Sequence, residues 1–134
     1  MFMLTQGAAT DLGFPDVCLT PAGPVPAPIP YPDTSMTATS APAAYNVLVD
    51  CMPVLNQMSE GLVSVGDDVG VELGVVSHMI SGETAYMVGC FTIFVDGMPA
   101  QRLTSVTGQN CVGVMPNGPG MCISPSQVTV LSLG

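Results

Sequence analysis

Six side chains in this 134-residue sequence could bind a metal ion through sulfur or imidazole nitrogen. They are the five cysteines and the single histidine: Cys18, Cys51, Cys90, Cys111, Cys122 and His78. No two of them form a CxxC or HxH pair, so their spacing carries no zinc signature. Three thiolates and one imidazole would still complete a closed tetrahedral zinc site if folding brought them together. The alternative is that the thiols are small buried side chains and the histidine binds nothing.

The surroundings of these residues separate them into two groups. Cys51 and Cys90 adjoin or lie within apolar runs, which favours a place in the core. The other four lie in segments flanked by proline or glycine, where ligands are usually carried: Cys18, His78, Cys111 and Cys122. We take these four as the candidate zinc ligands. Two alternatives remain open: the protein binds no metal, or a different set of residues binds it. Asp67 and Asp68 are interpreted as a turn.

No motif of a known enzyme class is present in the sequence. GxSxG, HExxH and a phosphate loop ending in GK[ST] are all missing. A nucleophilic pair could be drawn from His78 and any thiol, because such pairs meet in space rather than in sequence. The acidic pairs Asp67/Asp68 and Glu72/Glu83 are generic. We therefore expect a protein that is not an enzyme.

The charge balance excludes two classes of partner. Ten acidic residues stand against one basic residue, Arg102, and the net charge is −9. Recognition of phosphate needs clustered lysine and arginine, so nucleic acid and anionic membrane surfaces are not expected partners. Only 8% of residues are charged and 48% are hydrophobic, which suggests that a protein partner covers part of the surface.

The apolar residues do not predict a membrane span. Residues 103–134 are uncharged, but polar residues, glycine and proline interrupt them throughout, whereas a spanning helix needs about 20 predominantly apolar residues. The first residues, MFMLTQGAATDLGF, lack the basic start and long apolar run of a signal peptide. We expect synthesis in the cytoplasm without a signal peptide and no stable membrane insertion.

The length predicts one domain, residues 1–134, in two parts. Eight of the 13 prolines lie in residues 15–42, which favours extended chain over helix and predicts an N-terminal strap lying on the core. Residues 43–134 predict a body of short strands rich in valine, isoleucine, threonine and aromatic residues. The predicted strands are 44–50, 61–66, 69–76, 84–97, 102–106 and 127–133. No segment sustains a helical period, so the fold class is mainly β.

One short pattern occurs twice in the predicted body. YNVLVDCMP at 45–53 aligns with FTIFVDGMP at 91–99, and VD-x-MP is shared. QVTVLSLG at 127–134 is a third strand of similar composition without the turn. Two copies and a remnant fit pseudo-threefold symmetry. Gly97 accepts positive φ in the second turn at no steric cost, and because Cys51 does not, the first turn is expected to differ in detail.

These segments together resemble the PAAR-like family. MPAQR at 98–102 is similar to the Pro-Ala-Ala-Arg motif for which the family is named, with Gln101 in place of the second alanine. FTIFVDG before it is similar to the strand that leads into that motif. FPDVCLTPAGPVPAPIPYP at 14–32, SVGDDVG at 64–70 and PSQVTVLSL at 125–133 resemble the start, middle and closing strand of the family, so the resemblance covers nearly the whole chain.

The resemblance implies a small cone of short β-hairpins. Such cones cap the trimeric β-helical spike protein (VgrG-like) of type VI secretion systems and related contractile injection machines, and they leave the cell on the spike. A zinc ion usually braces the point, and by the resemblance Cys18 and Cys111 fall where the family places ligands. Arg102 is expected to pair at a junction between repeats. The alternative function is a small adaptor that recruits a separately encoded effector.

Overall fold

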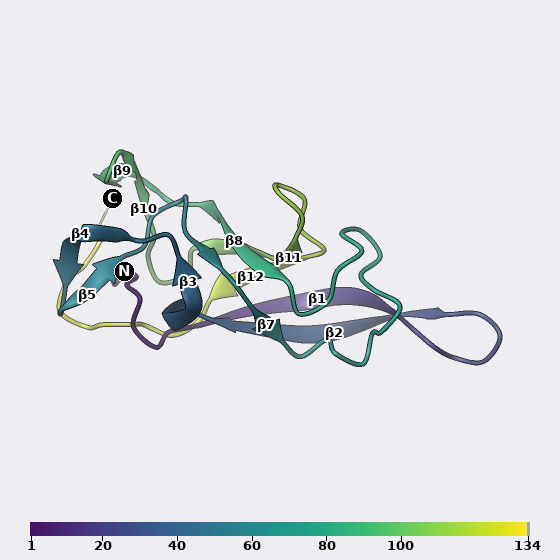
Figure 1. The fold of residues 1–134 in the computed structure, drawn as a ribbon. Coiled ribbons are helices and arrows are strands. Elements are labelled where there is room, and N and C mark those ends of the chain that lie inside the picture. The colour runs from purple at the N-terminus through teal and green to yellow at the C-terminus, as the bar shows by residue number, and fades with distance from the viewer. Residues whose placement is uncertain (134) are drawn as a thin grey trace.

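The structure is a computed structural model that describes residues 1–133, and it is nearly all β within that range (Figure 1). One 3-10 turn, Thr37–Thr39, is the single helical element there. The strands are β1 (Thr10–Thr20), β2 (Ala27–Met36), β3 (Ser40–Ala41), β4 (Ala44–Val49), β5 (Met52–Val54), β6 (Glu60–Gly61), β7 (Ser64–Val65), β8 (Glu83–Val88), β9 (Cys90–Val95), β10 (Met98–Ala100), β11 (Val106–Cys111) and β12 (Gly118–Cys122). The predicted fold class, a mainly β single domain of short hairpins, is confirmed.

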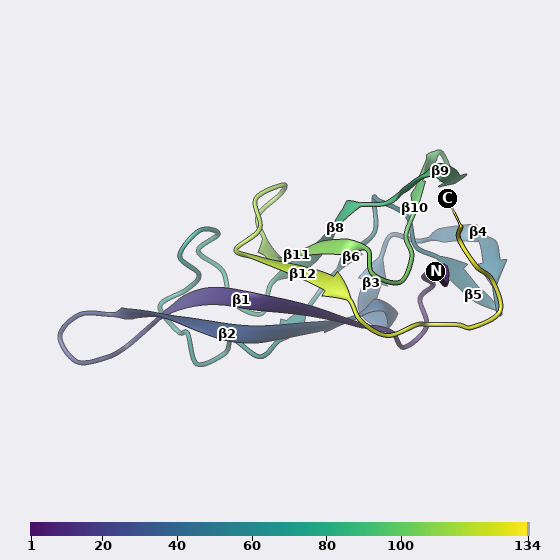
Figure 2. The same ribbon diagram turned by 180° about the vertical axis from the view of Figure 1, so that it is seen from behind.

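Eight strands form one curled antiparallel sheet, in the order β3-β6-β8-β11-β12-β1-β2-β7. Hairpins β4–β5 and β9–β10 are separate two-stranded sheets. They lie with both chain ends at one end of the molecule, which we call the base (Figures 1 and 2). The long β1–β2 hairpin extends toward the opposite end, and the loop of residues 66–82 lies beside it there.

The proline-rich segment is extended, and it is part of the sheet rather than a strap over it. β1 pairs with β12 on one side and with β2 on the other. The register shifts between Gly13 and Asp16, around Pro15, because proline has no N–H to donate to the ladder. β7 pairs with β2 only at Thr34 and Ser35, so the proline-containing half of β2 has an open edge that proline tolerates.

The base is built from three equivalent corners. Two are the repeats found in the sequence, hairpins β4–β5 and β9–β10. The third is made from the two ends of the chain, since residues 1–3 lie against residues 130–132. The matching cross-strand pairs are Leu48–Pro53, Phe94–Pro99 and Phe2–Leu131. The remnant at 127–133 is therefore completed by the N-terminal residues.

A closed ring of backbone hydrogen bonds joins the three corners. The N–H of Leu4 donates to the carbonyl of Gln101 at 2.9 Å, Gln101 donates to Leu55 at 3.0 Å, and Leu55 donates to Leu4 at 3.0 Å. A second set of three bonds also joins the corners in a cycle, but in the opposite donor-to-acceptor direction: Gln6 to Pro53, Gln57 to Pro99, and Leu103 to Phe2, at 2.8–3.0 Å. Three bridges, Thr5–Val54, Asn56–Ala100 and Met3–Arg102, join the same pairs of corners. The pseudo-threefold character is confirmed, and Arg102 lies at a junction between corners.

The two complete turns of the base have the same backbone conformation. Asp50 and Cys51 have φ of 53° and 63°, and Asp96 and Gly97 have φ of 55° and 79°. The expectation that the first turn differs is therefore wrong. Positive φ at both central residues is the hairpin turn whose twist matches the strands, and the strands impose it on Cys51 despite the steric cost.

Apolar cores are confined to the base and the adjoining part of the sheet. One contains Leu4, Ala9, Ala43, Leu55, Tyr86 and Cys122, and the other contains Met3, Ala44, Val54, Val95 and Ala100. Farther along the sheet the buried side chains are mostly polar, and most of them are hydrogen-bonded to one another; those that are include Asp16, Ser64, Asp67, Thr84, Thr107, Gln109 and Asn110. Such an interior is stable only when its donors and acceptors are satisfied.

Candidate functional site

The base presents matched apolar side chains at its three corners. At the first position Tyr45, Phe91 and Val128 are 61%, 63% and 67% exposed. At the second position Leu48, Phe94 and Leu131 are 60%, 60% and 51% exposed. In each corner this residue pairs with the strand that leads into the backbone rings, so Leu48, Phe94 and Leu131 occupy equivalent positions. Large apolar side chains in a repeated, exposed pattern indicate an interaction surface rather than scattered surface residues.

A buried group of acidic and thiol side chains lies away from the base. Among residues 1–133, Asp16, Cys18 and Asp67 form the one group of three His, Cys, Asp or Glu residues whose ligand atoms all lie within 4.8 Å of one another. All three are buried. Asp16 and Cys18 come from the inner face of β1, and Asp67 comes from the 66–82 loop. The group could hold a metal ion.

Two asparagine side chains hold the carboxylates of this group. Asn110 Nδ2 donates to Asp16 Oδ2 at 2.6 Å and to Asp67 Oδ2 at 2.5 Å. Asn117 Nδ2 donates to the other oxygen of Asp16 and to the carbonyl of Val17. The Cys18 thiol lies 3.7 Å from a carboxylate oxygen of Asp16 and of Asp67. Neutral donors therefore hold both buried carboxylates.

Burial and crowding of negative charge set the pKa values in this group. Desolvation raises the pKa of the Cys18 thiol to about 12, and the charges of Asp16 and Asp67 add to the effect. Desolvation also raises the pKa of Asp16, against the hydrogen bonds from Asn117 and Asn110. Asp33, which has no exposed surface, has its pKa raised to about 7, mainly by desolvation. The thiol is therefore protonated at neutral pH unless a cation displaces its proton.

Comparison with known families identifies the chain. The family described as Toxin PAAR-like domain matches residues 9–117. This protein belongs to the PAAR-like family. No curated protein and no solved structure matches the chain. Within residues 1–133, none of the helices is long and apolar enough to cross a membrane.

The PAAR-like chain does not bring the four predicted zinc ligands together. Cys18 lies in the acidic group, and the other three lie outside it. The Cys111 thiol is buried and donates to the carbonyl of Gly108 at 3.1 Å. Cys122 donates to Ser124 O at 3.4 Å, beside Asp11. His78 is exposed on the 66–82 loop with φ of 57°.

Of this group, the sequence predicts only Cys18 as a candidate ligand. Asp67 does begin a turn as expected, since the N–H of Gly70 donates to its carbonyl at 2.8 Å, but its side chain also belongs to the group. Asp16, Asn110 and Asn117 carry no motif. Each comes from a different element, and β-strand period alone does not say which distant strands will be neighbours. A usable signal was the alternation in β1, where Asp16 and Cys18 are two residues apart and so point to the same face of the strand.

The ligand atoms of this group are suited to a divalent metal ion, but their types differ from those of the predicted zinc site. Two carboxylates and one thiol converge, which are ligands that zinc accepts. Hydrogen bonds from the two asparagines do not prevent ligation, because a carboxylate oxygen has two lone pairs and metal-bound carboxylates are commonly hydrogen-bonded. Imidazole is absent from the group, so any metal here is held mainly by oxygen.

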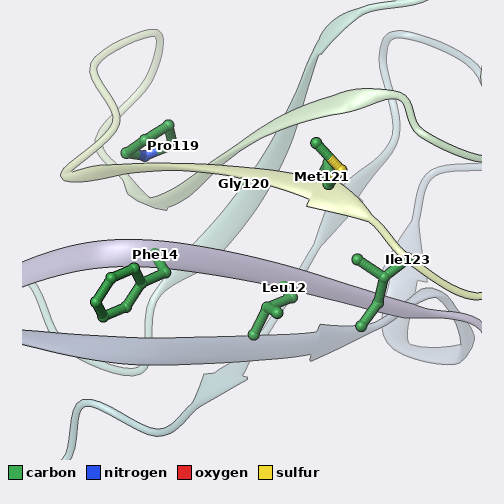
Figure 3. A pocket seen from close by; sticks show the side chains of 6 residues that line it. All are labelled: Leu12, Phe14, Pro119, Gly120, Met121 and Ile123. Atoms are coloured by element: carbon green, nitrogen blue, oxygen red, sulfur yellow. The ribbon is translucent and has the colours of Figure 1, made fainter.

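A shallow apolar groove lies on the outer face of the sheet in this PAAR-like domain. It has a volume of about 300 Å³ and is lined by Leu12, Phe14, Pro119, Gly120, Met121 and Ile123. Figure 3 shows these side chains along β1 and β12. Leu12 and Met121 face each other across the two strands. The groove is a second apolar surface, separate from the base residues.

Proposed function

We propose that this protein caps the end of a trimeric β-helical spike protein (VgrG-like) in a type VI secretion system or related contractile injection machine. The observation that carries the proposal is the three-cornered base, in which a single chain reproduces threefold symmetry in its backbone rings and in its exposed apolar side chains. A surface with this symmetry matches the end of a trimer, where each subunit offers the same contact once. One cap per trimer follows from the geometry.

The physical basis of docking is burial of the apolar corners. Six large side chains, two per corner, are half or more exposed in the isolated chain. Burial of such side chains contributes about 25 cal/mol per Å² of apolar surface, before the costs of association. The spike trimer also ends in open strand edges, which a β-rich cap would cover. The opposite end, with the 66–82 loop and the β1–β2 hairpin, would then lead during membrane puncture.

The test is a binding experiment with a purified spike trimer and single substitutions at each corner. Leu48→Asp, Phe94→Asp and Leu131→Asp each place a charge in one apolar contact and should weaken binding by about tenfold or more. Phe14→Asp is the matched control, because Phe14 is equally exposed (60%) but lies in the outer groove. Native mass spectrometry gives the stoichiometry, and surface plasmon resonance gives the affinity.

Two results would contradict the cap. A complex with three chains per trimer would mean that the three corners do not bind as a unit. Equal weakening by Phe14→Asp and by the corner variants would place the contact elsewhere.

We also propose that the protein has no enzymatic activity, is made in the cytoplasm without a signal peptide, and is delivered out of the cell with the spike. Recruitment of a separate effector would use surface outside the base, such as the groove in Figure 3.

Zinc is proposed as the metal of the acidic group, held by Asp16, Cys18 and Asp67. When bound it would supply a cross-link between β1 and the 66–82 loop. Elemental mass spectrometry on purified protein should find about one zinc per chain. Cys18→Ser should lose it and His78→Ala should keep it. If His78→Ala lost the zinc and Cys18→Ser kept it, the imidazole of His78 would be a ligand and the assignment to the acidic group would be wrong.

A further inference from the structure

We propose that Asn110 anchors the 66–82 loop in the way that a metal ion would, so that the loop stays fixed whether or not a metal is bound. Asn110, near the end of β11, is fully buried. Its amide nitrogen donates to a carboxylate on β1 and to a carboxylate on the loop, at 2.6 and 2.5 Å. One side-chain atom therefore joins β11, β1 and the loop.

The orientation of this amide is determined by its other end. Asn110 Oδ1 accepts from the backbone N–H of Gly82 at 2.6 Å and from the Ser64 hydroxyl at 3.3 Å. Rotating the amide by 180° would turn its NH₂ toward the N–H of Gly82 and its oxygen toward two carboxylates. Both contacts would then be repulsive, so Asn110 acts as a donor toward the acids.

The loop is held at both of its ends by this network. Asp67, at its start, accepts from the N–H of Ser81, near its end, at 3.2 Å. Gly82 donates to Asn110. In the middle of the loop, Asn117 Oδ1 accepts from the N–H of Val76 at 2.8 Å. Hydrogen bonds to charged groups are stronger than neutral ones, so the bonds from Asn110 to the acids dominate.

The charge of the surroundings explains why an amide suits this position. Asp33 is buried beside the group, and neither of its carboxylate oxygens has a hydrogen-bond partner within residues 1–133. The charges of Asp67 and Asp16 act on it. A neutral side chain with two N–H groups satisfies the acids without adding charge, whereas an aspartate at 110 would add a third carboxylate to the pair. Such a triplet needs a bound cation or a shared proton to offset its negative charge.

The test compares wild type with Asn110→Asp in the presence and absence of metal. The readout is hydrogen–deuterium exchange of the loop amides at residues 76, 77, 81 and 82 at about pH 8, with EDTA or with added zinc or calcium ions. In the wild type, EDTA should change these rates by less than about twofold. In Asn110→Asp with EDTA they should rise by about tenfold or more, and either cation should restore them.

Asn56→Asp is the matched control. Asn56 is also a buried asparagine, but it lies in the base and bonds to the carbonyl of Val95. It should leave the loop amides unchanged and show no response to cations. If Asn110→Asp does not fold, the wild-type arm decides alone. Loss of loop protection in wild type on metal removal would overturn the inference, and so would wild-type protection in Asn110→Asp with EDTA. The inference does not depend on spike binding or on zinc being present.

Discussion

Gln101 is a polar residue in a ring position where the other two corners have leucine. It is fully buried, and within residues 1–133 neither its side-chain nitrogen nor its oxygen has a hydrogen-bond partner. Its equivalents, Leu4 and Leu55, are fully buried in an apolar core. Gln101→Leu should therefore raise the free energy of unfolding by about 1–3 kcal/mol, since an unsatisfied buried amide is removed.

Chemical denaturation measures this effect, and Leu55→Gln is the reciprocal control that should lower stability. A drop in stability for Gln101→Leu would mean that the amide is bonded in solution, for example to a buried water. The comparison is sensitive because the two variants exchange the same side chains between equivalent places in the ring.

Asp33 makes stability depend on pH. Its pKa is about 7 in the folded protein and 3.8 in the reference state. Between these values the folded state binds the proton more tightly than the unfolded state, so stability falls as pH rises through this window and is greatest at its acid end. Asp33→Asn should reduce the loss of stability measured by urea denaturation between about pH 4 and about pH 7. A pH profile of Asp33→Asn that matches the wild type would contradict this assignment.

At the scale of elements, the two complete turns of the base differ in one informative residue. Cys51 has φ of 63° and its equivalent, Gly97, has φ of 79°. A residue with a Cβ pays about 1–2 kcal/mol in this conformation relative to glycine. Cys51→Gly should therefore raise the unfolding midpoint, and Gly97→Cys should lower it. Differential scanning calorimetry would check both, and an opposite sign for either would show that the side chains at the turn dominate.

The elements that sequence reasoning predicted correctly are those with a local signal. The repeat at 45–53 and 91–99 has β-branched and aromatic residues followed by an Asp-x-Met-Pro turn, and both copies form hairpins. The run at 69–76 carries similar residues but forms an irregular loop, in which Leu73 has φ of 77°. Its conformation is determined by hydrogen bonds to distant strands, such as Val75 N to Val17 O. Composition does not contain that information.

Only one strand of the third corner could be predicted, because only that strand carries a local signal. Residues 127–133 resemble the repeat strand, but residues 1–6 have no proline and share mainly Met1 with Met52 and Met98. Their role follows from closing a ring, which is a property of the whole chain. The candidate metal site was also only partly predicted, because Asp16, Asp67 and Asn110 meet only after the sheet has curled.

At the scale of the whole molecule, Gln127 joins the two ends of the chain. It is buried, and its Nε2 donates to the carbonyls of Met3 and Val130, each at 2.8 Å. Its Oε1 accepts from the N–H groups of Thr129 and Val130. Gln127→Ala leaves these groups without partners and should cost about 2 kcal/mol or more. Hydrogen–deuterium exchange of the backbone amides at 128–133 should accelerate more than that of the amides in the β9–β10 hairpin.

The control for this prediction is Gln57→Ala, because Gln57 is half-buried and its side chain donates one hydrogen bond, to Met87 O. It should destabilise less and leave the third corner protected. Uniform acceleration at all three corners in Gln127→Ala would mean that the ring opens as a single cooperative unit.

The third corner also determines the order of folding. Its two strands are separated by almost the entire chain, while each of the other corners is a local hairpin that closes over a few residues. Contacts between distant segments form late, because they carry the largest entropy cost of chain closure. During synthesis the first two corners and the backbone rings can form once residue 103 is available, but the third corner stays incomplete until residues 130–132 have left the ribosome. Under the proposed function, a nascent chain without those residues would present a closed ring but only two of its three apolar docking corners, and it would bind a spike more weakly than a chain that has all three.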